Sequence, residues 1–278
     1  MRNQILRPDD ISVVLQRMDL PFYKYHGTGN DFVLVDNRKK LLSGNENAFF
    51  AAICHRRFGI GADGVILLNL HPDYDFEMDY FNSDGNRSSM CGNGGRCIVR
   101  FAADLGIVRD EARFLAVDGP HVATLTGETV KLKMGHPTGF KTLEEGHYWI
   151  HTGSPHYVQL LGTPVADHDI VAHGRAIRNG GEWKAEGTNV NFVQVINEGE
   201  AHVRTYERGV EDETWSCGTG VTAVAEVMAR IFPDAPAVKL LHTPGGLLKV
   251  HTQDGQAPWL EGPATFVFTG SIPLPHRG

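Results

Sequence analysis

The chain of 278 residues carries one short pattern twice, namely a cysteine, a glycine-containing turn and an apolar helix-forming run. The first copy is Cys91 in SSMCGNGGRC, and the second is Cys217 in TWSCGTGVTA. The cysteines lie 217 minus 91, or 126, residues apart, which is close to half the chain. Tyr80 and Tyr206 stand at equal distances before them. This repeat indicates a duplicated protein whose two halves meet at a shared cleft.

Apolar residues follow each cysteine at the spacing of an α-helix. In the first copy they precede Gly106, and in the second they precede Pro233, both of which are typical of helix ends. The apolar positions are Cys97, Ile98, Phe101, Ala102 and Leu105, then Val221, Val224, Ala225, Met228 and Ile231. The spacing predicts two buried helices, each with a cysteine at its N-terminus. Cys97 and Cys54 are expected to lie in the core.

Most of the remaining chain reads as short strands separated by turns. FYKYHGTGNDFVLVDNR predicts two strands around a turn at residues 27–30, and VILLNL (65–70) and DFEMDYFN (75–82) predict two more. NAFFAAICHRRFG predicts a helix over residues 47–59, with Phe49, Ile53 and Phe58 at helical spacing. Because strands dominate and few helices connect them, the fold class is α+β with mixed sheets.

The repeat also predicts how the chain divides. We expect an N-terminal extension over residues 1–20, a first half over 21–135 and a second half over 136–267. The C-terminal strand, residues 268–278, is expected to return to the first half. The active site then lies in the cleft between the two halves.

Composition excludes several classes of function. The formal net charge is −7 and no basic cluster stands out, which argues against a nucleic-acid partner. No apolar run reaches the length of a membrane span, and charges interrupt the first 20 residues, so we expect a cytoplasmic protein. Four scattered cysteines do not make a disulfide scaffold, and without C-x-x-C spacing we expect no metal site.

Two thiols at helix N-termini suit one kind of chemistry. Free backbone N–H groups and the helix dipole bind a carboxylate, and the same field is expected to lower a cysteine pKa. A small acid held there would have Cys91 on one side of its α-carbon and Cys217 on the other. One thiolate can then remove the α-proton while the opposite thiol returns one, which inverts the stereocentre. The pattern therefore favours a racemase or epimerase that needs no cofactor.

In these and several further motifs, the sequence resembles the diaminopimelate epimerase family. The matching motifs fall in family order over residues 21–270: GTGNDFVLVDNR, GIGADGVILL, FNSDGNRSSMCGNGGRC, TGSPHYV, GTNVNF, YERGVEDETWSCGTG and GPATFVF. The resemblance implies interconversion of LL- and meso-2,6-diaminopimelate without a cofactor, in lysine and peptidoglycan biosynthesis. It also implies two β-barrel-like halves, each around a central helix, and a homodimer.

The resemblance further implies the site residues. Cys91 and Cys217 are expected to be the catalytic acid and base, with His156 beside Cys91 and Glu207 beside Cys217 in support. The residues implied in substrate binding are Asn30, Asn82, Gly92, Asn93, Asn189, Glu207, Arg208, Gly218 and Thr219. Arg208 suits the distal carboxylate of the substrate, because a guanidinium binds a carboxylate in a fork.

Some features leave alternatives open. Many family members carry Asn where this chain has Ser154, which leaves a substrate contact by Ser154 open. Some carry Gln where it has Gly64, so Gly64 is left out of the predicted site. A related cofactor-free racemase for proline, hydroxyproline or histidine would keep both cysteines. A dithiol redox protein would use them as a reversible disulfide. An anion-binding module would need neither cysteine.

Overall fold

The computed structural model describes residues 19–274. The predicted extension therefore lies outside the described residues up to position 18, as do residues 275–278 of the predicted C-terminal strand. The extension was predicted to run to residue 20, but strand β1 begins at Asp19 and Leu20 is fully buried. Leu20 packs in the apolar cluster with Phe22 and Val33, so residues 19 and 20 belong to the first lobe and not to an extension.

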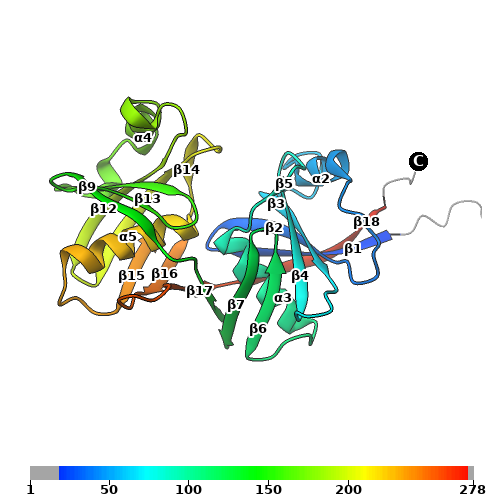
Figure 1. Cartoon of the computed structure of the whole chain (residues 1–278). Coiled ribbons are helices and arrows are strands. Elements are labelled where there is room, and N and C mark those ends of the chain that lie inside the picture. The colour runs from blue at the N-terminus through cyan, green and yellow to red at the C-terminus, as the bar shows by residue number, and fades with distance from the viewer. Residues whose placement is uncertain (1–18, 275–278) are drawn as a thin grey trace, which may run out of the picture.

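The molecule consists of two lobes, each with a curved sheet around one long helix (Figure 1). The first lobe holds β1 (Asp19–Gly27), β2 (Asn30–Asp36), α2 (Asn47–Cys54), β3 (Gly64–Asn69), β4 (Phe76–Asn82), β5 (Arg87–Ser88), α3 (Gly92–Asp104), β6 (Glu111–Ala116), β7 (Gly119–Thr126) and β8 (Thr129–Lys133). Strands outnumber helices, and parallel and antiparallel pairs alternate, which confirms the α+β class with mixed sheets.

The second lobe repeats this order of elements. It holds β10 (His147–His151), β11 (Pro155–Leu160), α4 (Ile170–Arg178), β12 (Asn189–Asn197), β13 (Glu200–Glu207), β14 (Asp212–Thr214), α5 (Gly218–Ile231), β15 (Val238–Thr243), β16 (Gly246–His251) and β17 (Trp259–Pro263), with 3-10 turns at Val165–Asp167 and Gly181–Trp183. In both lobes a hairpin leads to a parallel pair, an antiparallel pair, a second parallel pair and two antiparallel strands. The repeated topology supports the internal duplication.

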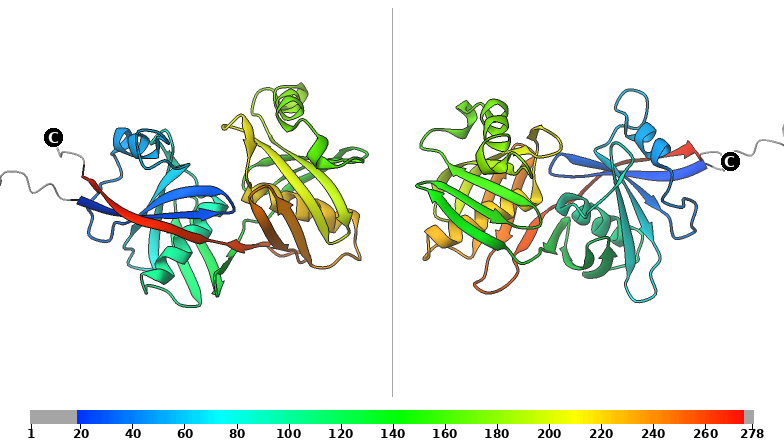
Figure 2. Two further views of the ribbon diagram at one scale, coloured as in Figure 1. Left: turned by 180° about the vertical axis from the view of Figure 1, so that it is seen from behind. Right: turned by 45° about the horizontal axis from the view of Figure 1, so that its top comes forward.

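Two strands and one pairing link the lobes. β18 (Thr265–Pro273) follows β17 of the second lobe but runs antiparallel to β1 of the first. β9 (Thr138–Glu144) follows β8 of the first lobe but runs antiparallel to β10 of the second. β17 pairs with β8, so the sheets of the two lobes are continuous there. Figure 2 shows β18 beside β1 along the outside of the first lobe. The domain boundaries drawn from the sequence remain a prediction.

The ladders align the two lobes residue by residue. Val65 stands between Val33 and Phe81 in the first lobe, on the face covered by α2. Val190 stands between Tyr157 and Tyr206 in the second, on the face packed with Ile170 and Ile177 of α4. Tyr206 therefore corresponds to Phe81. The sequence repeat aligned Tyr206 with Tyr80 instead, which is wrong by one residue because the link between strand and cysteine differs in length.

The opposite faces of these strands look toward the long helices. By the same alignment Val33 corresponds to Tyr157. The residues directly before them, Phe32 and His156, therefore also correspond. The facing pair Ile66 and Tyr80 corresponds to Asn191 and Thr205. Equivalent positions on the inner face are thus apolar or aromatic in the first lobe and polar in the second.

Two helix predictions need correction. The helix predicted over residues 47–59 ends at Cys54, because His55 is extended and the Ile60 N–H bonds back to Ile53 O. Phe58, predicted on its inner face, is 88% exposed. Helix α4 was not predicted at all.

Candidate active site

Each of the two repeated cysteines stands at the N-cap of a long helix, as the pattern predicted. Cys91 has φ −99° and ψ 130° ahead of α3, and Cys217 has φ −121° and ψ 112° ahead of α5. Both residues are extended, so the following glycine begins the helix. This geometry directs the unpaired N–H groups of each first turn toward the cysteine.

The two helix N-termini meet where the lobes join. A Cβ placed on Gly218 would lie 3.5 Å from Gly92 Cα, and one placed on Gly92 would lie 3.7 Å from Gly218 Cα. The Leu260 side chain lies against both glycines. Because glycine has no side chain, the backbones approach closely, and the free N–H groups of α3 and α5 gather in one place.

Polar side chains tie the lobes together beside these helix ends. Asn93 Nδ2 donates to Ser216 O at 3.1 Å and lies 3.2 Å from Ser216 Oγ, and Ser216 Oγ lies 2.7 Å from Thr28 Oγ1. The Arg96 guanidinium donates to Asn93 Oδ1 at 2.9 Å and to Thr28 Oγ1 at 3.2 Å. Sequence reasoning found Asn93 only through the family motif. It missed Arg96 and Ser216, whose partners are distant in sequence.

Burial dominates the acidity of both thiols. It raises the pKa of Cys91, and the backbone N–H groups of Gly94 and Asn93 lower that pKa by less. Burial also raises the pKa of Cys217, with the charge of Glu207 adding to the effect. The expectation that the helix ends would lower the cysteine pKa values is therefore wrong for this structure, because desolvation outweighs the helix field.

His156 is completely buried against the start of α5. Its Nε2 lies 2.9 Å from Thr219 Oγ1 and 2.9 Å from Ser154 Oγ, and Thr219 Oγ1 lies 3.5 Å from Cys217 Sγ. Burial lowers the pKa of His156 to about 3, so the ring is neutral. Within residues 19–274 no hydrogen bond joins His156 to either cysteine, and its predicted place beside Cys91 stays a prediction.

Glu207 and its neighbours close the second lobe's side of the site. Burial raises the pKa of Glu207, and its charge raises the pKa of both cysteines, which places it within electrostatic reach of both. Asn189 accepts a hydrogen bond from the Arg208 N–H at 2.9 Å and donates to Ser154 Oγ at 3.0 Å. Arg208 is exposed just beyond β13, and its guanidinium donates to Glu186 O. Ser154 thus lies among the predicted site residues.

The first lobe contributes two asparagines at strand ends. Asn30 Oδ1 accepts from the Cys91 thiol at 3.6 Å and from Asn93 Nδ2 at 3.2 Å, while its own amide donates to Asp63 at 2.7 Å. Asn82 is the last residue of β4 and half-buried. The structure therefore brings Asn30 directly to Cys91. It places Asn82 beside Gly64, its ladder partner, which in turn pairs with Phe32.

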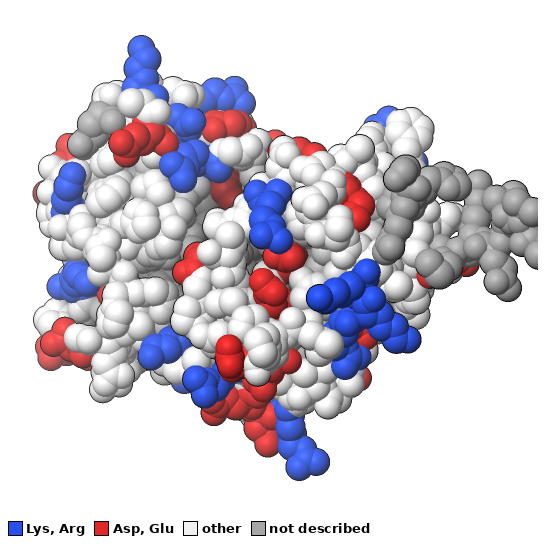
Figure 3. Space-filling model, turned by 45° about the vertical axis from the view of Figure 1, so that its right-hand side comes forward, with Lys and Arg blue, Asp and Glu red and all other residues white. Residues whose placement is uncertain are grey.

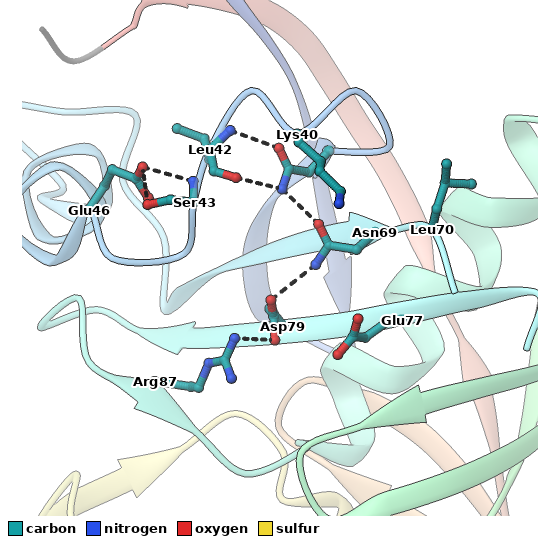
Figure 4. Close-up of a pocket in the computed structure, with 10 residues that line it drawn as sticks. Lys40, Leu42, Ser43, Glu46, Asn69, Leu70, Glu77, Asp79 and Arg87 are labelled. Atoms are coloured by element: carbon teal, nitrogen blue, oxygen red, sulfur yellow. Dashed lines mark hydrogen bonds and ion pairs between the residues drawn. The ribbon is translucent and has the colours of Figure 1, made fainter. Parts of the chain in front are cut away.

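A separate surface pocket of about 780 Å³ contains neither cysteine (Figure 4). Several of its polar side chains bond one another: Arg87 pairs with Asp79 at 2.6 Å, and Asn69 Nδ2 donates to Asp79 at 3.0 Å. Asn37 donates to Asn69 at 2.7 Å. The Asn69–Asp79 bond joins the end of β3 to β4.

Two features are absent from residues 19–274. This part of the chain holds no group of three or more His, Cys, Asp or Glu side chains arranged for a metal ion, and none of its helices combines the length and apolarity needed to cross a membrane. On the face shown in Figure 3, basic and acidic side chains lie interspersed.

With this geometry in place, comparison with known proteins identifies the family. The model of the family described as diaminopimelate epimerase matches residues 22–139 and 148–267. The chain belongs to the diaminopimelate epimerase family. The diaminopimelate epimerase of Flavobacterium psychrophilum is 41% identical over 91% of this chain and 100% of its own length. That of Aquifex aeolicus is 39% identical over 91% of this chain and 98% of its own.

Solved structures show that the fold is shared more widely. A phenazine biosynthesis protein of the PhzF family from Bacillus anthracis superposes with a TM-score of 0.71 at 14% identity, over 92% of this chain and 99% of that one. A hydroxyproline epimerase from Agrobacterium vitis superposes with a TM-score of 0.66 at 15% identity, over 94% of each chain. At these identities the likeness concerns the fold.

Proposed function

We propose that this protein is an isomerase that interconverts LL- and meso-2,6-diaminopimelate by inverting one α-carbon, with no cofactor. The observation that carries the proposal is the meeting of two helix N-termini at Gly92 and Gly218, with a cysteine at the N-cap of each. Membership of the diaminopimelate epimerase family supports the choice of substrate.

The reacting carboxylate binds between the helix ends. N–H groups at Gly92, Asn93, Gly218 and Thr219 donate to it, and the dipoles of α3 and α5 stabilise its negative charge. As the α-proton leaves, charge moves onto the carboxylate oxygens. The same donors then stabilise an enediolate-like intermediate, which lowers the barrier to forming the carbanion.

Cys91 and Cys217 exchange the proton. One cysteine, as thiolate, forms an S–H bond with the α-proton, and the electron pair of the C–H bond stays on the substrate. The opposite thiol then gives its proton to the other face of the carbon and becomes a thiolate. Because burial raises both cysteine pKa values, the α-ammonium group of the substrate is expected to favour the thiolate.

The remaining site residues hold and orient the substrate. His156 and Glu207 support the thiols, and Arg208 binds the distal carboxylate. Asn30, Asn82 and Asn189 bind the distal amino-acid group. Ser154 joins this set, since it bonds His156 and Asn189.

A panel of amino acids tests the proposal. We expect the purified protein to equilibrate LL- and meso-diaminopimelate and to leave proline, hydroxyproline and histidine unchanged. Racemisation of one of those three in place of diaminopimelate would overturn the substrate assignment. Loss of activity under reducing conditions with gain on oxidation would favour the dithiol redox alternative.

We further propose a homodimer in the cytoplasm. Strand β18 exposes Phe266, Val267 and Phe268 by 47%, 50% and 43%, and among residues 19–274 it pairs only with β1. An apolar edge of this kind suits a second copy of the chain. Four free cysteines fit a reducing compartment. Light scattering is expected to give a dimer mass, and Val267→Lys to shift it toward the monomer; a monomeric wild-type protein would contradict the dimer.

A further inference from the structure

Asn191 lies behind His156, on the side away from Thr219. The residue is completely buried on β12, and its Nδ2 lies 3.1 Å from His156 Nδ1. The same amide nitrogen donates to Tyr157 O at 2.9 Å. Asn191 Oδ1 accepts from Thr205 Oγ1 at 3.0 Å. All the hydrogen-bonding groups of this amide therefore have partners.

The Tyr157 carbonyl fixes which way the amide points. A carbonyl oxygen only accepts, so the atom of Asn191 that faces it must be the nitrogen. The second hydrogen of that nitrogen then points at His156 Nδ1. An amide nitrogen does not accept a hydrogen bond, so His156 Nδ1 must accept and cannot carry a proton. In a neutral imidazole the proton is then on Nε2.

The Nε2 proton points toward the reacting groups. Nε2 lies 2.9 Å from both Ser154 Oγ and Thr219 Oγ1, and Thr219 follows Cys217 by two residues. Adding a second proton would place N–H against N–H at Asn191. The charges that act on the ring, from His151 and Arg208, also oppose its protonation.

We infer that Asn191 is a positioning residue that holds the His156 proton on Nε2, so that His156 donates a hydrogen bond into the active site and does not act as a base. This inference rests on the proposed function for its catalytic meaning. It refines that proposal, because it assigns proton transfer to the two thiols alone and orientation to His156.

The wild-type protein tests the inference directly. Protein labelled with ¹⁵N in its histidine rings is studied by long-range ¹H–¹⁵N correlation, and His156 is assigned by its absence in His156→Gln. We expect a protonated Nε2 and a bare Nδ1 from about pH 5.5 to about pH 8. A proton on Nδ1, or formation of imidazolium with a midpoint near the ordinary value of about 6.5, would overturn the inference.

Variants of Asn191 test whether its NH₂ group sets the tautomer of His156. In Asn191→Asp a carboxylate faces Nδ1 and accepts from it, so the proton should move to Nδ1. kcat should fall about 10- to 100-fold with KM within about threefold, as expected for a residue acting through another. Asn191→Leu, which has no donor, should show both tautomers. An unchanged Nε2–H tautomer in either variant would contradict the role of Asn191.

Two controls complete the experiment. Thr205→Val removes the hydrogen bond to Asn191 Oδ1 but leaves the Asn191 NH₂ facing Nδ1, so the Nε2–H tautomer should persist. Asn45→Asp, an exposed asparagine of the first lobe, should keep both the wild-type spectrum and kcat. A protein with the expected tautomer but no epimerase activity would refute the proposed function alone. An active epimerase with a proton on His156 Nδ1 would refute this inference alone.

Discussion

The inner wall of the first lobe is apolar where that of the second is polar, although equivalent strands build both. Beside α3, a Cβ on Gly94 would lie 3.1 Å from Ile66 Cδ1 and near the Phe32 ring. Beside α5, a Cβ on Gly220 would lie 2.5 Å from Asn191 Oδ1. The two helix ends thus share a backbone geometry but differ in the side chains behind them.

This difference suggests a division of labour after duplication. The shared part, two glycine-rich helix ends, supplies donors for one carboxylate and must be symmetric to bind it from both sides. The divergent part sets the surroundings of each thiol. Cys91 bonds Asn30, whereas Cys217 lies beside Thr219 and, through it, His156. The two cysteines therefore need not be equally acidic.

The largest expected effect comes from the shared part. Cys91→Ser and Cys217→Ser should each reduce epimerisation of LL-diaminopimelate by about a thousandfold, since an alcohol is a far weaker acid than a thiol and the transfer needs both faces. Cys97→Ser, in the core of the first lobe, serves as a control that disturbs folding more than chemistry. Near wild-type turnover in Cys91→Ser or Cys217→Ser would contradict the mechanism, which requires both thiols.

A second comparison concerns equivalent positions one turn into each helix. Arg96 is fully buried. Its guanidinium donates to Thr28 Oγ1 in the same lobe and to the carbonyl of Pro263, the last residue of β17. The hydroxyl of its counterpart Thr222 donates to Gly218 O at 2.8 Å, within its own helix. Arg96→Ala should lower the free energy of unfolding by roughly 3–5 kcal/mol, through a cavity and unpaired polar groups. Thr222→Val should cost about 1 kcal/mol. Urea denaturation measures both, and equal costs would contradict the asymmetry.

Alanine substitutions of two equivalent glycines compare the inner walls of the two lobes. Gly220→Ala should destabilise by about 2–3 kcal/mol, since its methyl group would collide with the Asn191 amide. Gly94→Ala meets the flexible ends of Ile66 and Met78 and should change stability by less than about 1 kcal/mol, helped by the better helix propensity of alanine. Thermal unfolding distinguishes the two. A costlier change at Gly94 would mean that the apolar wall is the tighter one.

A further test is the pH dependence that buried His156 of the second lobe gives to the free energy of unfolding. The pKa of His156 is lowered to about 3 in the folded protein, so below about pH 6.5 the unfolded chain binds a proton that the folded one does not. The free energy of unfolding should therefore fall by about 1.4 kcal/mol per pH unit as the pH drops from about 6.5 toward 3. His156→Gln should remove that part of the slope, whereas Phe32→Leu should leave it unchanged. Identical slopes for wild type and His156→Gln would contradict the burial of a neutral ring.

Much of this comparison could be predicted from sequence, because duplication and helical periodicity are local patterns. The helices after Cys91 and Cys217 followed from such patterns, and the strands predicted at 65–70 and 75–82 lie within one residue of β3 and β4. Helix α4 was missed although Asp169 caps it by accepting from the Ala172 N–H. Its short apolar pattern is interrupted by Gly174, which the Tyr206 ring requires.

The parts that escaped prediction depend on contacts between distant segments. The motif GTNVNF contains both Asn189 and Asn191, and it does not show which of them faces His156 Nδ1. That follows only from the pairing of β11 with β12. The raised pKa values of the thiols follow from burial at the junction of the lobes, which no local pattern reports. Phe58 fitted a helical period but lies beyond the end of its helix.

The most direct test of two opposed thiols is turnover of LL-diaminopimelate in D₂O, with α-deuterium measured in both isomers during the first few per cent of conversion. Each thiol works on its own face of the α-carbon, and the donor has exchanged with solvent before substrate binds. We predict that the meso product carries deuterium at the inverted carbon from the first turnovers, while the remaining LL substrate stays unlabelled. A meso product that retains the original α-proton would contradict the account.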